Sequence, residues 1–169
     1  MYAQQQLIEE VTEQKQLTIP VSEHLFDEDV HLTGLVEYGI SWADLTSGKA
    51  EIPLTGARFD ISFEGTFAGP RMKGKIVGVD YLTVRADGRF KLDLHAHLDT
   101  DDGEIIDLYE DGILIAPDPD DEERIAQMRL NFEFVTTSSK YAWLNQVQGW
   151  GRGWVDWKTG KVVMHVYAA

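Results

Sequence analysis

The feature that most constrains the fold is an alternating run between two Asp-Gly pairs. The positions of this run that fall on one face are Phe90, Leu92, Leu94, Ala96 and Leu98, and those between them are Lys91, Asp93, His95, His97 and Asp99. A period of two places the two sets on opposite faces of a half-buried β-strand. Asp87-Gly88, Asp102-Gly103 and Asp111-Gly112 predict tight turns, because Gly adopts a positive φ without steric cost. Residues 80–112 are therefore predicted to form three short strands.

Further short strands are expected along most of the chain. They are predicted at residues 31–42 (with a bulge at Gly34), 57–63, 75–79, 128–135, 148–157 and 162–167. A loop is predicted at 65–74, punctuated by Gly65, Gly69 and Gly74. The acidic run 118–124 is predicted to be a loop, in which a single helical turn that extends through Gln127 is allowed. Many strands with almost no internal helix predict an all-β fold.

We predict a single antiparallel β-barrel domain over residues 17–169. Closure removes exposed strand edges, and Gly149, Gly151 and Gly153 share one strand face, which favours tight coiling or the close approach of a ligand or backbone. Residues 1–16 are predicted to form a short helical extension, with Leu7, Ile8 and Val11 as a narrow apolar stripe. Such a stripe is typical of a peripheral helix, and it also predicts a homodimer or higher homo-oligomer.

Composition excludes several classes of partner and chemistry. The net charge of −14 argues against nucleic acid and anionic membrane surfaces. The absence of cysteine excludes disulfides and thiolate catalysis, and no apolar stretch approaches transmembrane length. The N-terminus lacks the basic and apolar regions of a signal peptide. A cytoplasmic protein is therefore expected.

Two groups of residues resemble the signature segments of a known family. The first is Gly78-Val79-Asp80-Tyr81, Arg85-Ala86-Asp87-Gly88, Leu92-Asp93 and Thr100-Asp101-Asp102-Gly103; the second is Phe134, Thr136 and Tyr141-Ala142-Trp143-Leu144-Asn145. Together they resemble the domain-of-unknown-function 3237 family over roughly residues 63–169. The resemblance implies a compact antiparallel barrel of the lipocalin-like or allene-oxide-cyclase-like kind, and it lends little chemistry.

The pair His95 and His97 is the main local cluster with chemical potential. Both side chains leave the same face of one strand, roughly 7 Å apart. Three interpretations are open: solvated histidines on the outer face, acid–base histidines in a polar pocket, or a metal site completed by His165. The sequence contains no Gly-rich phosphate loop and no nucleophile elbow. We expect no cofactor and no intrinsic metal.

The acid–base interpretation includes two residues of the preceding strand. The Asp87-Gly88 turn makes that strand a neighbour of the histidines, so Asp80 and Tyr81 are predicted to act with His95 and His97 in catalysis. Ordinary cross-strand pairing is the alternative. The predicted substrate contacts are Arg85, Tyr141, Trp143, Asn145, Trp150 and Arg152, in which the aromatic rings form a flat wall and Asn145 and Arg152 are polar anchors.

These residues favour a cofactor-independent lyase, isomerase or cyclase. Its substrate would be a small apolar molecule, aromatic or polyketide-like, held in the barrel lumen. The alternatives are a non-catalytic barrel that binds a small apolar ligand and an interaction protein that assembles through its N-terminal helix. The face occupied by His95 and His97 discriminates between the first two: if both meet solvent while Leu92, Leu94 and Leu98 line the interior, the histidine mechanism loses its support.

Overall fold

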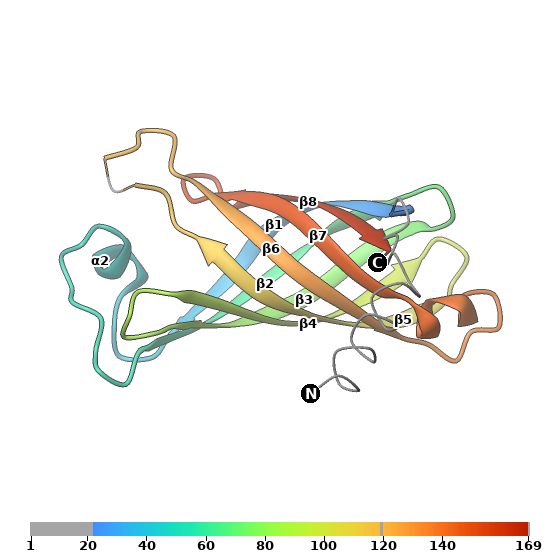
Figure 1. Ribbon diagram of the computed structural model, residues 1–169, viewed down its shortest axis with the longest axis horizontal. Helices are drawn as coiled ribbons and strands as arrows, with labels where there is room; N and C mark the ends of the chain where they lie inside the picture. Colours follow the sequence, from blue (N-terminus) through green and yellow to red (C-terminus); the bar gives the residue numbers. More distant parts are fainter. Residues whose placement is uncertain (1–21, 119, 169) are drawn as a thin grey trace, which may run out of the picture.

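The computed structural model describes residues 22–118 and 120–168, which form a closed antiparallel β-barrel (Figure 1). Each strand pairs with the next in the chain, and the last pairs with the first. The strands are β1 (His24–Glu37), β2 (Ala57–Ala68), β3 (Lys73–Val84), β4 (Phe90–Thr100), β5 (Ile105–Ile115), β6 (Ile125–Val135), β7 (Gln148–Asp156) and β8 (Lys161–Ala168). The predicted barrel is confirmed, whereas the predicted helix at 1–16 lies outside the described residues.

Strand β4 has the two faces that its alternation predicts. Its apolar positions are buried inside the barrel, and its lysine and histidines are exposed. The turns at Gly88 and Gly103 connect β3 to β4 and β4 to β5, and both glycines have a positive φ. The predicted turn at Asp111-Gly112 is wrong, because β5 continues through it. A Cβ at Gly112 would lie 2.0 Å from the Arg129 carbonyl oxygen, so this glycine serves a close approach of β5 to β6.

Other strand boundaries also differ from those expected. The segment predicted at 31–42 is β1, which starts at His24 and ends at Glu37, and its register shift between Leu32 and Gly34 confirms the bulge. The predicted loop at 65–74 shrinks to the turn between β2 and β3, because Gly65 and Gly74 pair within the ladders. The described residues of 118–124 form no helical turn.

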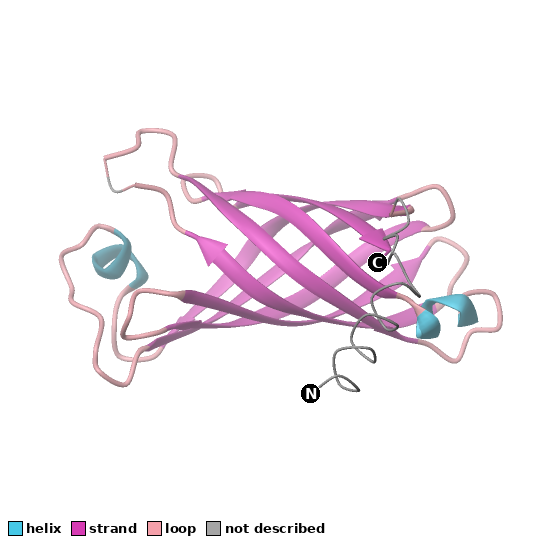
Figure 2. Ribbon diagram, viewed as in Figure 1, coloured by secondary structure: helices cyan, strands magenta, loops and turns pink. Residues whose placement is uncertain are grey.

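The two ends of the barrel differ. Helix α2 (Trp42–Thr46), which the sequence did not predict, lies at one end, and the 3₁₀ helix η1 (Ala142–Gln146) lies at the other (Figure 2). Towards the η1 end the lumen is filled by edge-to-face and stacked contacts among Phe26, Phe67, Phe132 and Phe134. This packing leaves the α2 end as the part of the lumen that can hold a ligand.

The glycines of β7 face inward, as close approach requires. A Cβ at Gly149 would lie 2.9 Å from Phe132 Cβ, and one at Gly151 would lie 2.7 Å from Phe132 Cε2. At Gly153 it would meet the Val163 carbonyl oxygen at 2.2 Å. The absent side chains therefore let β7 pack against the aromatic core and against β8.

Gly153→Ala is expected to destabilise the barrel by roughly 1–3 kcal/mol, because the Val163 backbone cannot move aside without distorting the ladder. The matched control is Gly34→Ala, whose Cβ would find its nearest atom, Ser62 Oγ, at 3.4 Å. That variant should change the free energy of unfolding by less than about 0.5 kcal/mol in urea titrations. Equal stability of the two variants would contradict the close-approach role of Gly153.

Candidate functional site

The lumen contains a cavity of about 350 Å³ towards the α2 end. Its walls are almost entirely aliphatic and aromatic, and Trp42 and Trp157 lie at its mouth. The Trp42 ring packs edge-on against Phe59, Phe90 and Trp157, with centroid distances of 5.1 to 6.2 Å. Helix α2 thus covers the mouth with an indole ring. Size and lining fit a small apolar ligand.

Three carboxyl groups interrupt this apolar wall. Glu28, Asp80 and Glu110 are the ionisable residues among the described ones that line the cavity, and these residues are 4%, 7% and 1% exposed. They come from β1, β3 and β5, and in each of these three strands the even-numbered positions around them face inward. Leu94 pairs with Asp80 on one side and with Glu110 on the other, so β4 alone separates these two strands.

The hydrogen bonding of the three groups is unequal. The Asp93 backbone N–H donates to Asp80 Oδ1 at 3.0 Å. In the described part of the chain, Oε1 of Glu28 and Oε1 of Glu110 are buried without a hydrogen-bond partner. A buried polar atom without a partner costs about 1–3 kcal/mol, so the site contains acceptors that the fold itself does not satisfy.

Burial raises the pKa of all three carboxyl groups. It raises the pKa of Glu28 to about 8. It raises the pKa of Asp80 to about 7, where the Asp93 N–H acts in the opposite direction and the charges of Asp93 and Asp60 add to the rise. It also raises the pKa of Glu110 well above its ordinary value, with the charges of Glu28 and Asp80 adding to the effect. Near neutral pH the cavity therefore holds protonated acids together with a partly ionised carboxylate.

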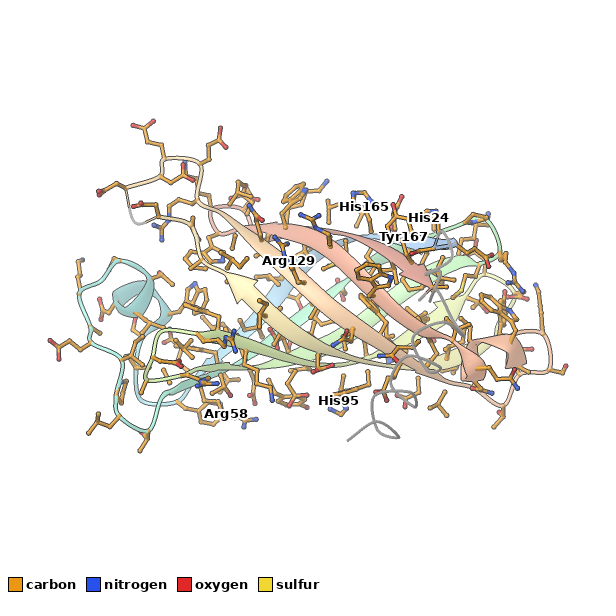
Figure 3. The ribbon with its side chains drawn as sticks, viewed as in Figure 1. His24, Arg58, His95, Arg129, His165 and Tyr167 are labelled. Atoms are coloured by element: carbon orange, nitrogen blue, oxygen red, sulfur yellow. The ribbon has the colours of Figure 1, made fainter. Side chains whose placement is uncertain are left out.

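The structure places the predicted histidines outside this cavity. The side chains of His95 and His97 are 62% and 48% exposed, and His95 projects from the outer wall (Figure 3). The His95 ring lies between Tyr81 and Tyr109, at centroid distances of 5.8 and 5.0 Å, so Tyr81 is also on the outer face. The expectation that these residues border the lumen is wrong, because the leucine face of β4 fills the interior. Of the four predicted catalytic residues, Asp80 alone lines the cavity.

The aromatic residues predicted to form one wall lie in separate parts of the barrel. Trp150 is 50% exposed on the outer face of β7, and Arg152 shares that face. Tyr141 is buried near the η1 end, where its hydroxyl donates to Asp102, and the Arg71 guanidinium stacks on Trp143 at 3.5 Å. These four residues do not line the cavity, contrary to expectation.

The remaining two predicted contacts have local structural partners. Arg85 lies at the β3–β4 turn and pairs with Asp87 at 2.7 Å. The Asn145 side chain bonds the backbone of Thr136 through both its oxygen and its nitrogen, and so fastens η1 to the end of β6. Neither lines the cavity, so the predicted polar anchors are wrong as cavity contacts.

Sequence reasoning missed Glu28 and Glu110, although a signal exists. In β5 the inward positions are Ile106, Leu108, Glu110 and Leu114, so one carboxylate stands in an otherwise apolar set. Glu28 likewise stands between Phe26 and Val30. An acid at the parity of buried residues is uncommon unless it is paired or functional.

The described residues contain neither a metal-binding cluster nor a membrane-spanning helix. Within 22–118 and 120–168, no group of three or more His, Asp or Glu side chains is arranged to hold a metal ion. The prediction that the protein carries no intrinsic metal stays a prediction. In the same ranges no helix is long and apolar enough to cross a membrane.

Comparison with known proteins gives a relative with an assigned activity. The hydroalkoxylation enzyme phnH of Penicillium herquei is 35% identical over 88 residues, which cover 52% of this chain and 50% of the relative. The chain thus matches about half the length of that relative.

The match to solved structures with the same architecture covers a larger share of both chains than the match to phnH does. A β-barrel-like protein from Acinetobacter baumannii superimposes with a TM-score of 0.71 at 26% identity, covering 90% of this chain and 99% of its own. A protein of unknown function from Clostridium acetobutylicum gives 0.70 at 22% identity, with 88% and 97% covered. An enzyme from Penicillium herquei gives 0.64 at 23% identity, with 92% and 98% covered.

The family predicted from the signature segments is confirmed over most of the chain. The pattern of the family described as "Protein of unknown function (DUF3237)" matches residues 43–169. This match starts before the first signature segment and includes β2 to β8. It therefore contains Asp80 on β3, Glu110 on β5 and the strand β4 between them. The chain belongs to the DUF3237 family.

Proposed function

We propose that this protein is a cofactor-independent enzyme of the lyase, isomerase or cyclase type, acting by proton transfer on a small apolar substrate in the barrel lumen. The observation that carries the proposal is the set of carboxyl groups of Glu28, Asp80 and Glu110 in an otherwise apolar cavity. The walls favour an uncharged aromatic or polyketide-like molecule, and the carboxyl groups supply both an acid and a base.

The similarity to a hydroalkoxylation enzyme supports addition of a hydroxyl group across a carbon–carbon double bond as the reaction. A carboxylic acid gives its proton to one alkene carbon, and the π electrons form the new C–H bond. The other alkene carbon becomes cationic, and a hydroxyl oxygen of the same substrate bonds to it. That hydroxyl then loses its proton to a carboxylate. Substrate and product have the same formula, so no oxidant or reductant is consumed.

The unequal environments of the carboxyl groups assign their roles. Glu110 is the proton donor, because burial and the nearby charges of Glu28 and Asp80 raise its pKa and keep it protonated. Asp80 is the base, because the Asp93 N–H stabilises its ionised form. An ionised carboxylate in the cavity wall also stabilises the cationic carbon. The cycle closes when the proton returns from Asp80 to Glu110, with Glu28 as a second protonated group beside it.

The non-catalytic binding barrel is the competing function. It requires the same apolar walls but gives the three carboxyl groups no chemical task. Turnover and its dependence on these groups therefore separate the two functions.

Asp80→Asn and Glu110→Gln are each expected to reduce turnover by at least about 100-fold, the usual size of a lost general acid or base. A suitable probe is 2-(3-methylbut-2-enyl)phenol, which is uncharged, gives a tertiary cation and cyclises to 2,2-dimethylchroman. Product is measured by gas chromatography, and in D₂O one deuterium should appear on the ring carbon that was protonated.

The matched control is Glu133→Gln, which removes an exposed carboxylate from β6 and should leave turnover unchanged. His95→Ala and His97→Ala should also leave it unchanged, because both side chains face solvent. Equal turnover in Asp80→Asn and the wild type would contradict the proposed base. No turnover by the wild type would favour the binding function.

The stability of the folded protein is expected to fall as the pH rises from about 4.5 to 8. Because the pKa of Glu28 is higher in the folded state, the folded protein holds more protons than the unfolded chain in this range. The contribution of Glu28 alone is at most roughly 5 kcal/mol. Urea midpoints at pH 5 and pH 8.5 measure the fall.

Glu28→Gln should remove part of this pH dependence, since the amide does not titrate. Glu133→Gln, at an exposed position, should keep the wild-type dependence. A Glu28→Gln variant whose stability falls as steeply as the wild type would show that Glu28 ionises normally in the folded protein.

A further inference from the structure

Among the described residues that line the cavity, the ionisable side chains are all acids. Its titratable lining residues are Glu28 on β1, Asp80 on β3 and Glu110 on β5. The other strands contribute only apolar residues to the lining: Ile61 and Phe63, Leu92 and Leu94, Met128 and Leu130, Val155, and Val162 and Met164. Asp93 and Asp60 act on Asp80 from β4 and β2, and both add negative charge. The described cavity thus carries an unbalanced set of acids.

Two of these acids present acceptors that nothing in the described fold satisfies. Oε1 of Glu28 and Oε1 of Glu110 are buried without a hydrogen-bond partner, in side chains that are 4% and 1% exposed. Surface acids keep their water shells, whereas these acids have lost them. A cation that enters the cavity therefore meets these unpaired oxygens as dipoles and the ionised Asp80 as its counter-charge, at low local dielectric.

The mouth adds a second feature, a pair of indole rings, one of which already lies under a cation: the Arg124 guanidinium is 5.2 Å from the centroid of the Trp157 ring. Trp42 and Trp157 line the cavity and lie edge-to-face, with ring centroids 5.3 Å apart. Tryptophan is the aromatic residue with the strongest attraction for a cation over its face. A ligand that enters past α2 meets these rings before it reaches the carboxyl groups.

We infer that the cavity binds lipophilic ammonium ions, with the charged centre beside Glu28, Asp80 and Glu110 and the apolar part against the aliphatic and indole walls. The inference rests on the proposed function, because an ammonium ion resembles the cationic carbon of the proposed reaction. A site that stabilises such a cationic state also binds stable molecules that resemble it tightly. The binding itself requires no turnover.

The ionisation of Asp80 links this binding to pH. With a pKa of about 7, its ionised fraction rises from roughly one tenth at pH 6 to nine tenths at pH 8. A ligand with a permanent charge should therefore bind about tenfold more tightly at pH 8. Binding at pH 6 should release up to about one proton, because the ligand has no proton to give and the carboxyl group must lose its own.

The test uses benzyltrimethylammonium chloride and the full chain in isothermal titration calorimetry. The measurements are made at pH 6 and pH 8, in buffers of different ionisation enthalpy and in about 0.15 M NaCl, which screens the acidic surface. Neopentylbenzene, in which a carbon replaces the charged nitrogen, is the uncharged comparison. Asp80→Asn removes the proposed counterion while keeping an acceptor for the Asp93 N–H, and Glu133→Gln removes an exposed charge.

The expected result is binding that tightens about tenfold from pH 6 to pH 8 in the wild type and in Glu133→Gln. Asp80→Asn should bind more weakly at pH 8 and keep only a smaller rise in affinity with pH, because Glu28 still gains charge in this range. Neopentylbenzene should bind with an affinity that does not rise with pH, which tests the inference in the wild type even if a variant fails to fold. Equal binding by Asp80→Asn, or no difference between charged and uncharged ligands, would overturn it.

The outcomes also separate this inference from the proposed function. Ammonium binding without turnover of any prenylphenol would support the inference and contradict the enzyme. Turnover without ammonium binding would support the proposed enzyme and contradict the inference of ammonium binding.

Discussion

The burial of carboxyl groups inside a closed apolar barrel is the constraint on which the site depends. An ionised carboxylate that loses its water without gaining a partner costs several kcal/mol, so the group keeps its proton. Glu28 and Glu110 are in this situation, and Asp80 escapes part of it through the Asp93 N–H. One backbone hydrogen bond thus makes otherwise similar groups chemically different, and this difference allows an acid and a base to coexist in one cavity.

Strand periodicity predicted the fold well, because a period of two is a local property that survives in the closed barrel. The faces of β4, the turns at Gly88 and Gly103 and the bulge at Gly34 follow from local sequence. Glycine at 112 was misinterpreted because a turn and a close interstrand approach both require the missing Cβ, and only the register with β6 separates them. Helix α2 is five residues long and gives no periodic signal.

The site was harder to predict, because it depends on which face of each strand becomes the interior. The sequence showed that His95 and the leucines of β4 lie on opposite faces, and hydrophobic burial alone decides which face fills the lumen. Applied to β1 and β5, the same rule places Glu28 and Glu110 inside, among residues that pattern reading assigns to the core. Glu28, Asp80 and Glu110 face one cavity only in the closed barrel, where β1 lies across the lumen from β5.

The three carboxyl groups also weaken the fold that holds them. Replacing a buried acid with an apolar residue of similar volume is often neutral or stabilising, and nothing in the described ladder or aromatic core requires Glu28 or Glu110 as a partner. Phe26, Phe67, Phe132 and Phe134 fill the lumen towards the η1 end, so the barrel can fill its interior with apolar side chains. At the α2 end it holds acids and empty volume instead. A structural role does not explain that choice, whereas the ligand or substrate that we propose for the cavity does.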